Sequence, residues 1–222
     1  CKVKGCGVIS DVTHIIFDKD KMSEISHLSH FVIGSIRKFF SLPDGAFLLS
    51  ESEAEIKNEY RYEFLKMRTY GFFSRYYSFI NGFNNDENLL FLKGAEKLLD
   101  ESYDYGFSIG YLSENILKSF SVDDYSEKIK SNFNYLNSVF ETEYNFFSPY
   151  FPLVFSDKEK RDLYRKKLFS DKIFVPVHWD TEFLGDKKNI LSDIIFSIPC
   201  DYRYDSEDMK KVSENIERKD LI

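Results

Sequence analysis

The chain is poor in cysteine, has no excess of positive charge and contains no apolar run long enough to cross a membrane. Its three cysteines, Cys1, Cys6 and Cys200, are odd in number and widely spaced, so they predict no disulfide framework. A formal net charge of −7 argues against a nucleic-acid partner, which requires a basic face. With no secretory signal pattern at the start, we expect a cytoplasmic protein with neither a nucleic-acid nor a membrane partner.

Several motifs of known chemistry are also missing. The sequence has no glycine-rich phosphate loop, no zinc-ligand spacing and no serine nucleophile elbow, and we expect no metal site. Hydrophobic residues make up 43% of the chain and charged residues 30%, as in ordinary globular proteins. The basic residues between 158 and 167 alternate with acidic and apolar ones, which predicts the solvated side of a helix.

Short apolar segments dominate the first fifty residues. Strands are predicted over residues 7–10, 14–17, 31–34 and 46–49. Runs without alternating polarity are typical of a parallel sheet that is covered on both faces. Because the chain begins with Cys1 just before the first strand, we expect that a natural N-terminal part is missing.

Helical periodicity follows. Residues 50–53 resemble a helix N-cap and predict a long helix that runs to about residue 79. Further helices are predicted over 88–101, 113–120 and 122–141, the last beginning at Ser121 or Asp123. From residue 149, strands over 150–155, 173–177 and 194–198 alternate with helices over 157–169 and 206–218. The prediction is an α/β fold in three parts: 1–50, a helical segment 51–148, and a small C-terminal α/β domain 149–222.

Asp11, His14 and Lys38 form the most informative pattern for chemistry. Pyridoxal phosphate (PLP) needs a lysine amine for its aldehyde, a carboxylate for its pyridine nitrogen and a donor near its phenolic oxygen. Asp11 ends an apolar strand, His14 follows three residues later, and Lys38 comes just after another strand, where we predict partial burial. Each residue also has a structural interpretation: a turn aspartate, a hydrogen-bonded histidine, and a surface Arg37-Lys38 pair.

SDVTHIIF (10–17) resembles the strand-Asp-x-x-His/Gln element of the DegT/DnrJ/EryC1/StrS aminotransferases, a family of fold-type I PLP enzymes. VIGSIRKFFSLPDGAFLL (32–49) resembles the family's active-lysine segment, with a shorter gap between serine and lysine. The resemblance implies that Lys38 is the catalytic lysine that holds PLP and moves the proton. It also implies that Asp11 meets the pyridine nitrogen, that His14 orients the ring and that Ser35 contacts the phosphate.

The resemblance extends over most of the chain. KIKSNFNYLNSVF (128–140) looks like a family helix with an Arg-Arg-x-Asn-Tyr motif, but Ser131 and Asn132 stand where arginines are common. FVPVHWD (174–180) and the segment 194–212 resemble the C-terminal domain of a subgroup linked to surface-polysaccharide sugars. His178 and Arg203 are the substrate candidates there, although His178 also fits a packing role and Asp201 or Asp205 also fits as an ion-pair partner of Arg203.

The resemblance implies a PLP-dependent aminotransferase that acts on a nucleotide-linked keto sugar, with an amino-acid donor, expected to be glutamate. Residues 1–50 then correspond to the C-terminal part of the PLP-binding large domain. A homodimer is implied as well. The alternative from a different class is a non-catalytic or truncated remnant of this fold that acts as an interaction subunit. It is favoured by the expected missing N-terminal part and by Ser131 and Asn132.

Overall fold

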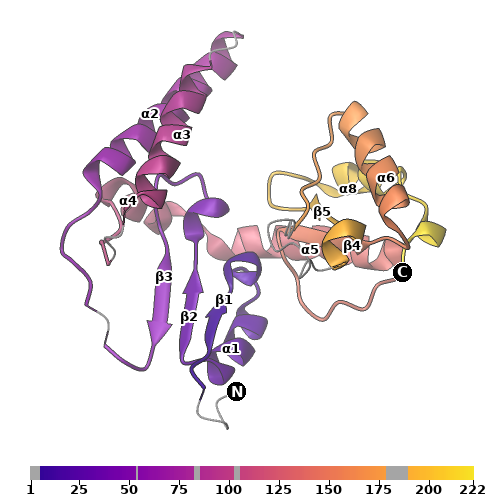
Figure 1. Cartoon of the computed structure of the whole chain (residues 1–222), viewed down its shortest axis with the longest axis horizontal. Coiled ribbons are helices and arrows are strands. Elements are labelled where there is room, and N and C mark those ends of the chain that lie inside the picture. Colours follow the sequence, from indigo (N-terminus) through magenta and orange to yellow (C-terminus); the bar gives the residue numbers. More distant parts are fainter. Residues whose placement is uncertain (1–5, 54, 83–85, 103–105, 179–189) are drawn as a thin grey trace. The chain divides into compact units, whose positions relative to one another are not determined.

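A computed structural model describes residues 6–53, 55–82, 86–102, 106–178 and 190–222, and it is a mixed α/β structure (Figure 1). The chain divides into two compact units. The first is built from 1–13 and 24–120, and the second from 14–23 and 121–222. The three-part division drawn from the sequence stays a prediction. None of the helices in the described ranges combines the length and apolarity that a membrane span requires.

The first unit holds a three-stranded sheet of β1 (Ile9–Asp11), β2 (Phe31–Gly34) and β3 (Phe47–Ser50). β1 pairs with β2 in parallel, and β2 pairs with β3 in antiparallel orientation, so the sheet is mixed, not parallel. These three strands were predicted, but the strand predicted over 14–17 is wrong. A 3₁₀ helix, Thr13–Ile15, begins there, because Asp11 Oδ1 accepts a hydrogen bond from Thr13 N at 2.9 Å and turns the chain.

One face of this sheet is exposed to solvent, contrary to the prediction of a sheet covered on both faces. The strand register places Ile9, Phe31, Ile33 and Leu48 on that face. Their exposed fractions are 67%, 36%, 39% and 43%. Val32 points to the opposite face and is buried.

The described part of the first unit also contains the α-helices α2 (Tyr62–Asn81), α3 (Glu87–Asp100) and α4 (Tyr111–Ser119). α2 and α3 lie side by side (Figure 1), so closely that a Cβ on Gly71 would lie 2.7 Å from Leu92 Cδ2. The predicted start of α2 near residue 51 is wrong. Lys57 N donates to Gly106 O and Ser108 N to Glu59 O, and this pairing holds the preceding segment extended.

Helix α1 (Lys19–Leu28) lies where the chain crosses between the units. The second unit then contains α5 (Val122–Phe140), β4 (Tyr150–Val154), α6 (Lys158–Ser170), α7 (Leu191–Ile194), β5 (Ile195–Pro199) and α8 (Ser206–Ser213). The N-cap at Ser121 is confirmed, since its hydroxyl accepts a bond from Asp124 N. β4 and β5 are antiparallel.

Residues 173–177 were predicted to be a strand but form none. Pro176 accepts a bond from Ser197 N at 2.8 Å, but proline has no N–H to return to the ladder. The predicted last helix is also too long, because α8 ends at Ser213.

The core of the second unit is aromatic and aliphatic. Phe133 and Phe151 have ring centroids 4.8 Å apart and are fully buried. Arg161 departs from the predicted solvated face of its helix: only 6% of it is exposed, and its Nη1 donates to Ile195 O. Its side chain is therefore buried together with the guanidinium, while its neighbours in the basic run include more exposed residues.

Candidate functional site

The turns that follow β1 and β2 lie together in the first unit. Because the two strands are parallel neighbours, with Asp11 opposite Ile33, the residues after them emerge at the same edge of the sheet. Val12 N donates to Ile33 O at 2.8 Å, and Ser35 N donates to Thr13 Oγ1 at 2.9 Å. Three predicted residues lie at this edge: Asp11 is the last residue of β1, and Ser35 and Lys38 belong to the turn after β2.

Asp11 and Lys38 are both exposed. One carboxylate oxygen of Asp11 accepts the Thr13 backbone bond, which fixes the side chain at the strand end. Lys38 ends a 3₁₀ helix, Ile36–Lys38, whose next residues Phe39 and Phe40 are buried. The prediction that Lys38 is partly buried is wrong, because this turn directs the two phenylalanines inward and leaves the lysine in solvent.

Ser35 is partly buried and lines a pocket of about 280 Å³ in the first unit, together with Arg37, Asp44 and Arg61. Its backbone N–H is already bonded to Thr13. The neighbouring turn contains Gly45 with a φ of 133°, a backbone conformation that favours glycine. Gly45 O accepts bonds from Ile36 N and Arg37 N, so this glycine shapes the segment on which Ser35 and Lys38 lie.

The second unit brings two further predicted residues together. The ring centroids of His14 and His178 are 4.9 Å apart in an edge-to-face arrangement. Tyr150, the first residue of β4, lies 4.8 Å from His178 and 5.6 Å from His14. His178 Nδ1 is 3.1 Å from Ser197 Oγ on β5, which fixes the orientation of the imidazole. Two imidazoles and a phenol thus converge over the paired strands, as a polar cluster with proton-carrying groups.

Arg203, the other substrate candidate, pairs with Asp201 through two bonds, Nε to Oδ1 at 2.8 Å and Nη2 to Oδ2 at 2.7 Å. The bond to Asp201 raises the pKa of Arg203, and 61% of the arginine side chain remains exposed. Of the two acidic partners considered for it, Asp201 makes the pair, while Asp205 caps α8. Burial, and then the charge of Asp201, raises the pKa of the Tyr150 phenol, so this phenol is held neutral.

Four residues at these places escaped the sequence reasoning: Thr13, Tyr150, Ser197 and Asn132. From the sequence, Asn132 is noted only as a residue at a position where the family commonly has arginine. It is buried, and its Nδ2 lies 3.0–3.3 Å from the carbonyl oxygens of Cys200, Asp201 and Tyr204. It therefore holds the turn that carries Arg203. An asparagine between apolar helix positions was the signal that could have found it.

The remaining histidine and metal-ligand candidates add nothing to these two groups of residues. His30 Nδ1 accepts a bond from Val8 N at 3.0 Å, which is a structural role. No group of three or more histidine, cysteine or acidic residues that could hold a metal occurs in the ranges that the structure describes. Trp179, beside His178, lies outside those ranges.

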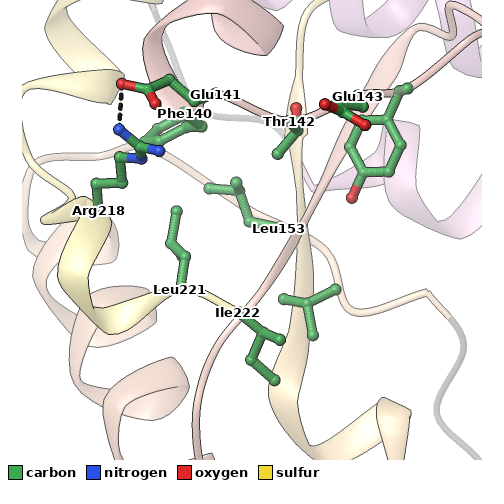
Figure 2. Close-up of a pocket in the computed structure, with 10 residues that line it drawn as sticks. Phe140, Glu141, Thr142, Glu143, Leu153, Arg218, Leu221 and Ile222 are labelled. Atoms are coloured by element: carbon green, nitrogen blue, oxygen red, sulfur yellow. Dashed lines mark ion pairs between the residues drawn. The ribbon is translucent and has the colours of Figure 1, made fainter.

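A pocket of about 470 Å³ in the second unit is lined by Phe140, Leu153, Ile222 and the ion pair of Glu141 with Arg218 (Figure 2). Figure 2 shows apolar side chains filling its lower part, and it contains none of the predicted site residues. Its other polar groups come from Thr142, Glu143 and Tyr144.

No family model, no curated protein and no solved structure matches the chain.

Proposed function

We propose that the chain binds PLP covalently at Lys38 and acts as an aminotransferase. The observation that carries the proposal is the relation between two strands: Asp11 ends β1 and Lys38 follows the carboxyl end of β2, and these strands are parallel neighbours. In open α/β sheets, ligands bind outside the carboxyl ends of the strands.

The residues at this edge suit PLP. An amine in solvent is reachable by an aldehyde, and a carboxylate fixed at a strand end suits a pyridinium nitrogen. PLP, when bound, supplies a ring that withdraws electrons from the carbon beside the amino group. Lys38 would attach the cofactor and afterwards move the proton, Asp11 would keep the pyridine nitrogen protonated, and Ser35 would contact the phosphate.

The finer parts of the proposal come from the resemblance. They are membership of the fold-type I sugar aminotransferases, a nucleotide-linked keto sugar as acceptor, an amino-acid donor, a homodimer and a role in surface-polysaccharide synthesis. The role of His14 at the cofactor ring also comes from the resemblance alone. His14 is part of the second unit, whereas Asp11 and Lys38 are part of the first. For His178 and Arg203, a substrate role is supported by the cluster around Tyr150 and by the exposed part of the Arg203 side chain.

Covalent trapping tests the cofactor site without relying on activity. The chain is incubated with PLP, reduced with borohydride, digested, and its lysines are compared by mass spectrometry. We expect the phosphopyridoxyl label to concentrate on Lys38, with an absorption band that Lys38→Ala removes. Lys97 and Lys118, whose side chains are 72% and 68% exposed, serve as internal controls for non-specific labelling.

Asp11→Asn is the second variant, because it keeps the side-chain size and the oxygen that Thr13 N binds. We expect it to lower the labelling of Lys38 by roughly tenfold, since an amide gives the pyridinium no charge to pair with. Equal labelling of Lys38, Lys97 and Lys118 would contradict the proposal and favour the alternative, a non-catalytic interaction subunit.

A further inference from the structure

The pocket beside Ser35 in the first unit gathers charged groups that the proposed function leaves unused. Its volume is about 280 Å³. Arg37, Asp44 and Arg61 line it, with Phe107 and Ser108. A pocket of this size suits a molecule as small as an amino acid or a sugar phosphate.

Asp44 lines this pocket and has one carboxylate oxygen without a hydrogen-bond partner in the described residues. Its Oδ2 accepts a bond from Gly110 N at 2.8 Å, whereas its Oδ1 is buried without a hydrogen-bond partner in the described residues. A buried acceptor left without a donor is unfavourable, because it has lost its hydrogen bonds to water. A ligand that brings an ammonium or hydroxyl group to Oδ1 would replace such a bond.

Positive charge exceeds negative charge around this pocket. Arg37 donates to Glu96 through Nη1 and Nη2, each at 3.0 Å, and Arg68 Nη1 donates to the same carboxylate at 2.7 Å. Two guanidinium groups therefore divide one negative charge. Arg61 stacks on Phe107, with its Cζ 4.9 Å from the ring centroid, and has no carboxylate partner within the described ranges. An anionic group is the complement of this surplus.

We infer that this pocket binds a small organic anion that also carries a hydrogen-bond donor, either the ammonium of an amino acid or the hydroxyl of a phosphate ester. The anionic group binds near Arg61 and Arg37, and the donor binds Asp44 Oδ1. The inference does not rest on the proposed function, although Ser35 lines this pocket and is also a proposed phosphate contact.

Isothermal titration of the chain without PLP tests the inference with two pairs of probes. L-glutamate is compared with glutarate, which lacks the ammonium group, and galactose 1-phosphate with galactose, which lacks the anion. Glutamate and galactose 1-phosphate are the two-group probes, since each carries both an anion and a donor. We expect at least one of them to bind roughly tenfold or more tightly than its partner that lacks one group, a difference of about 1.4 kcal/mol in binding free energy. The pair that shows this advantage identifies the source of the donor.

Arg61→Gln and Asp44→Asn then locate the binding. Arg61→Gln is expected to weaken the favoured probe by tenfold or more. Asp44→Asn keeps an oxygen for Gly110 N but replaces the unused acceptor with a donor, so it should remove the advantage of glutamate over glutarate and reduce that of the phosphate ester less. Arg75→Gln and Asp100→Asn, at exposed positions outside the pocket, are the matched controls.

The inference fails if neither two-group probe outperforms its partner, or if Arg61→Gln leaves the Kd of the favoured probe within twofold. Displacement of that probe by PLP would assign the pocket to the cofactor and also overturn it. Probe binding without selective labelling of Lys38 would instead refute the proposed function alone.

Discussion

Thr13 Oγ1 accepts a hydrogen bond from the backbone N–H of Ser35 at 2.9 Å, and this bond joins the turns after two parallel strands. Thr13 is buried, and its own N–H is held by Asp11. One threonine therefore connects the segment that carries the proposed pyridine partner with the segment that carries Ser35 and Lys38.

Thr13→Val is expected to lower the free energy of unfolding by about 1–2 kcal/mol, because it leaves the Ser35 N–H unsatisfied in a partly buried position. Labelling of Lys38 by PLP and borohydride should fall by roughly tenfold, since the two turns lose their fixed spacing. Urea denaturation and peptide mass spectrometry measure the two effects. Thr13→Ser restores the hydroxyl and should restore both; equal labelling in the valine and serine variants would show that this bond does not position the lysine.

Asn132→Ala is expected to destabilise the second unit by about 2–3 kcal/mol. The substitution removes the shared donor of three carbonyl groups, two of them in bonds that are fully buried. The urea midpoint measures the loss, and Asn134→Ala, exposed on the same helix, is the control. A loss no greater than that of the control would mean that the turn at Asp201–Tyr204 is held by other contacts.

The two thiols in the described ranges should differ in reactivity. Cys6 is exposed, whereas Cys200 is buried, donates to Ser148 O at 3.2 Å and has a pKa raised by burial. Because the thiolate is the reactive form, we expect iodoacetamide at pH 8 to modify Cys6 in minutes and Cys200 only when the chain unfolds. Peptide mass spectrometry with and without urea distinguishes them; modification of both at the same rate in the native chain would contradict the burial of Cys200.

Local sequence patterns predicted most helices and strands because their signals are local. The serine before α5 and the apolar runs of β1, β2 and β3 each act within a few residues. The predictions were wrong where contacts with residues far away in the sequence, or a proline, determine the local structure. The extended segment before α2 pairs with residues around Gly106, some fifty positions away, and Pro176 cannot complete a strand that its neighbours favour.

For the candidate site, individual residues could be predicted from the sequence, but their grouping in space could not. Strand ends identified Asp11 and Lys38, since a polar residue after an apolar run is visible in one sequence. The grouping of His14 with His178 was not, because more than 150 positions separate them and the pairing of β4 with β5 helps to bring Tyr150 and Ser197 to the same cluster. The unused oxygen of Asp44 was equally hidden, since a Pro-Asp-Gly turn predicts an exposed aspartate.

The phenol of Tyr150 gives this cluster a measurable pH dependence. Its pKa is raised above the ordinary value of 10.0, chiefly by burial and then by Asp201. The unfolded chain therefore loses this proton first, so the phenol contributes its stability below about pH 10, and the contribution is lost as the pH rises towards the folded pKa. Tyr150→Phe should flatten the decline of the urea midpoint above pH 10, whereas Tyr111→Phe, at a position 75% exposed, should leave its slope unchanged. If the urea midpoint declines equally in the unmodified chain and in Tyr150→Phe, burial and Asp201 do not keep this hydroxyl protonated.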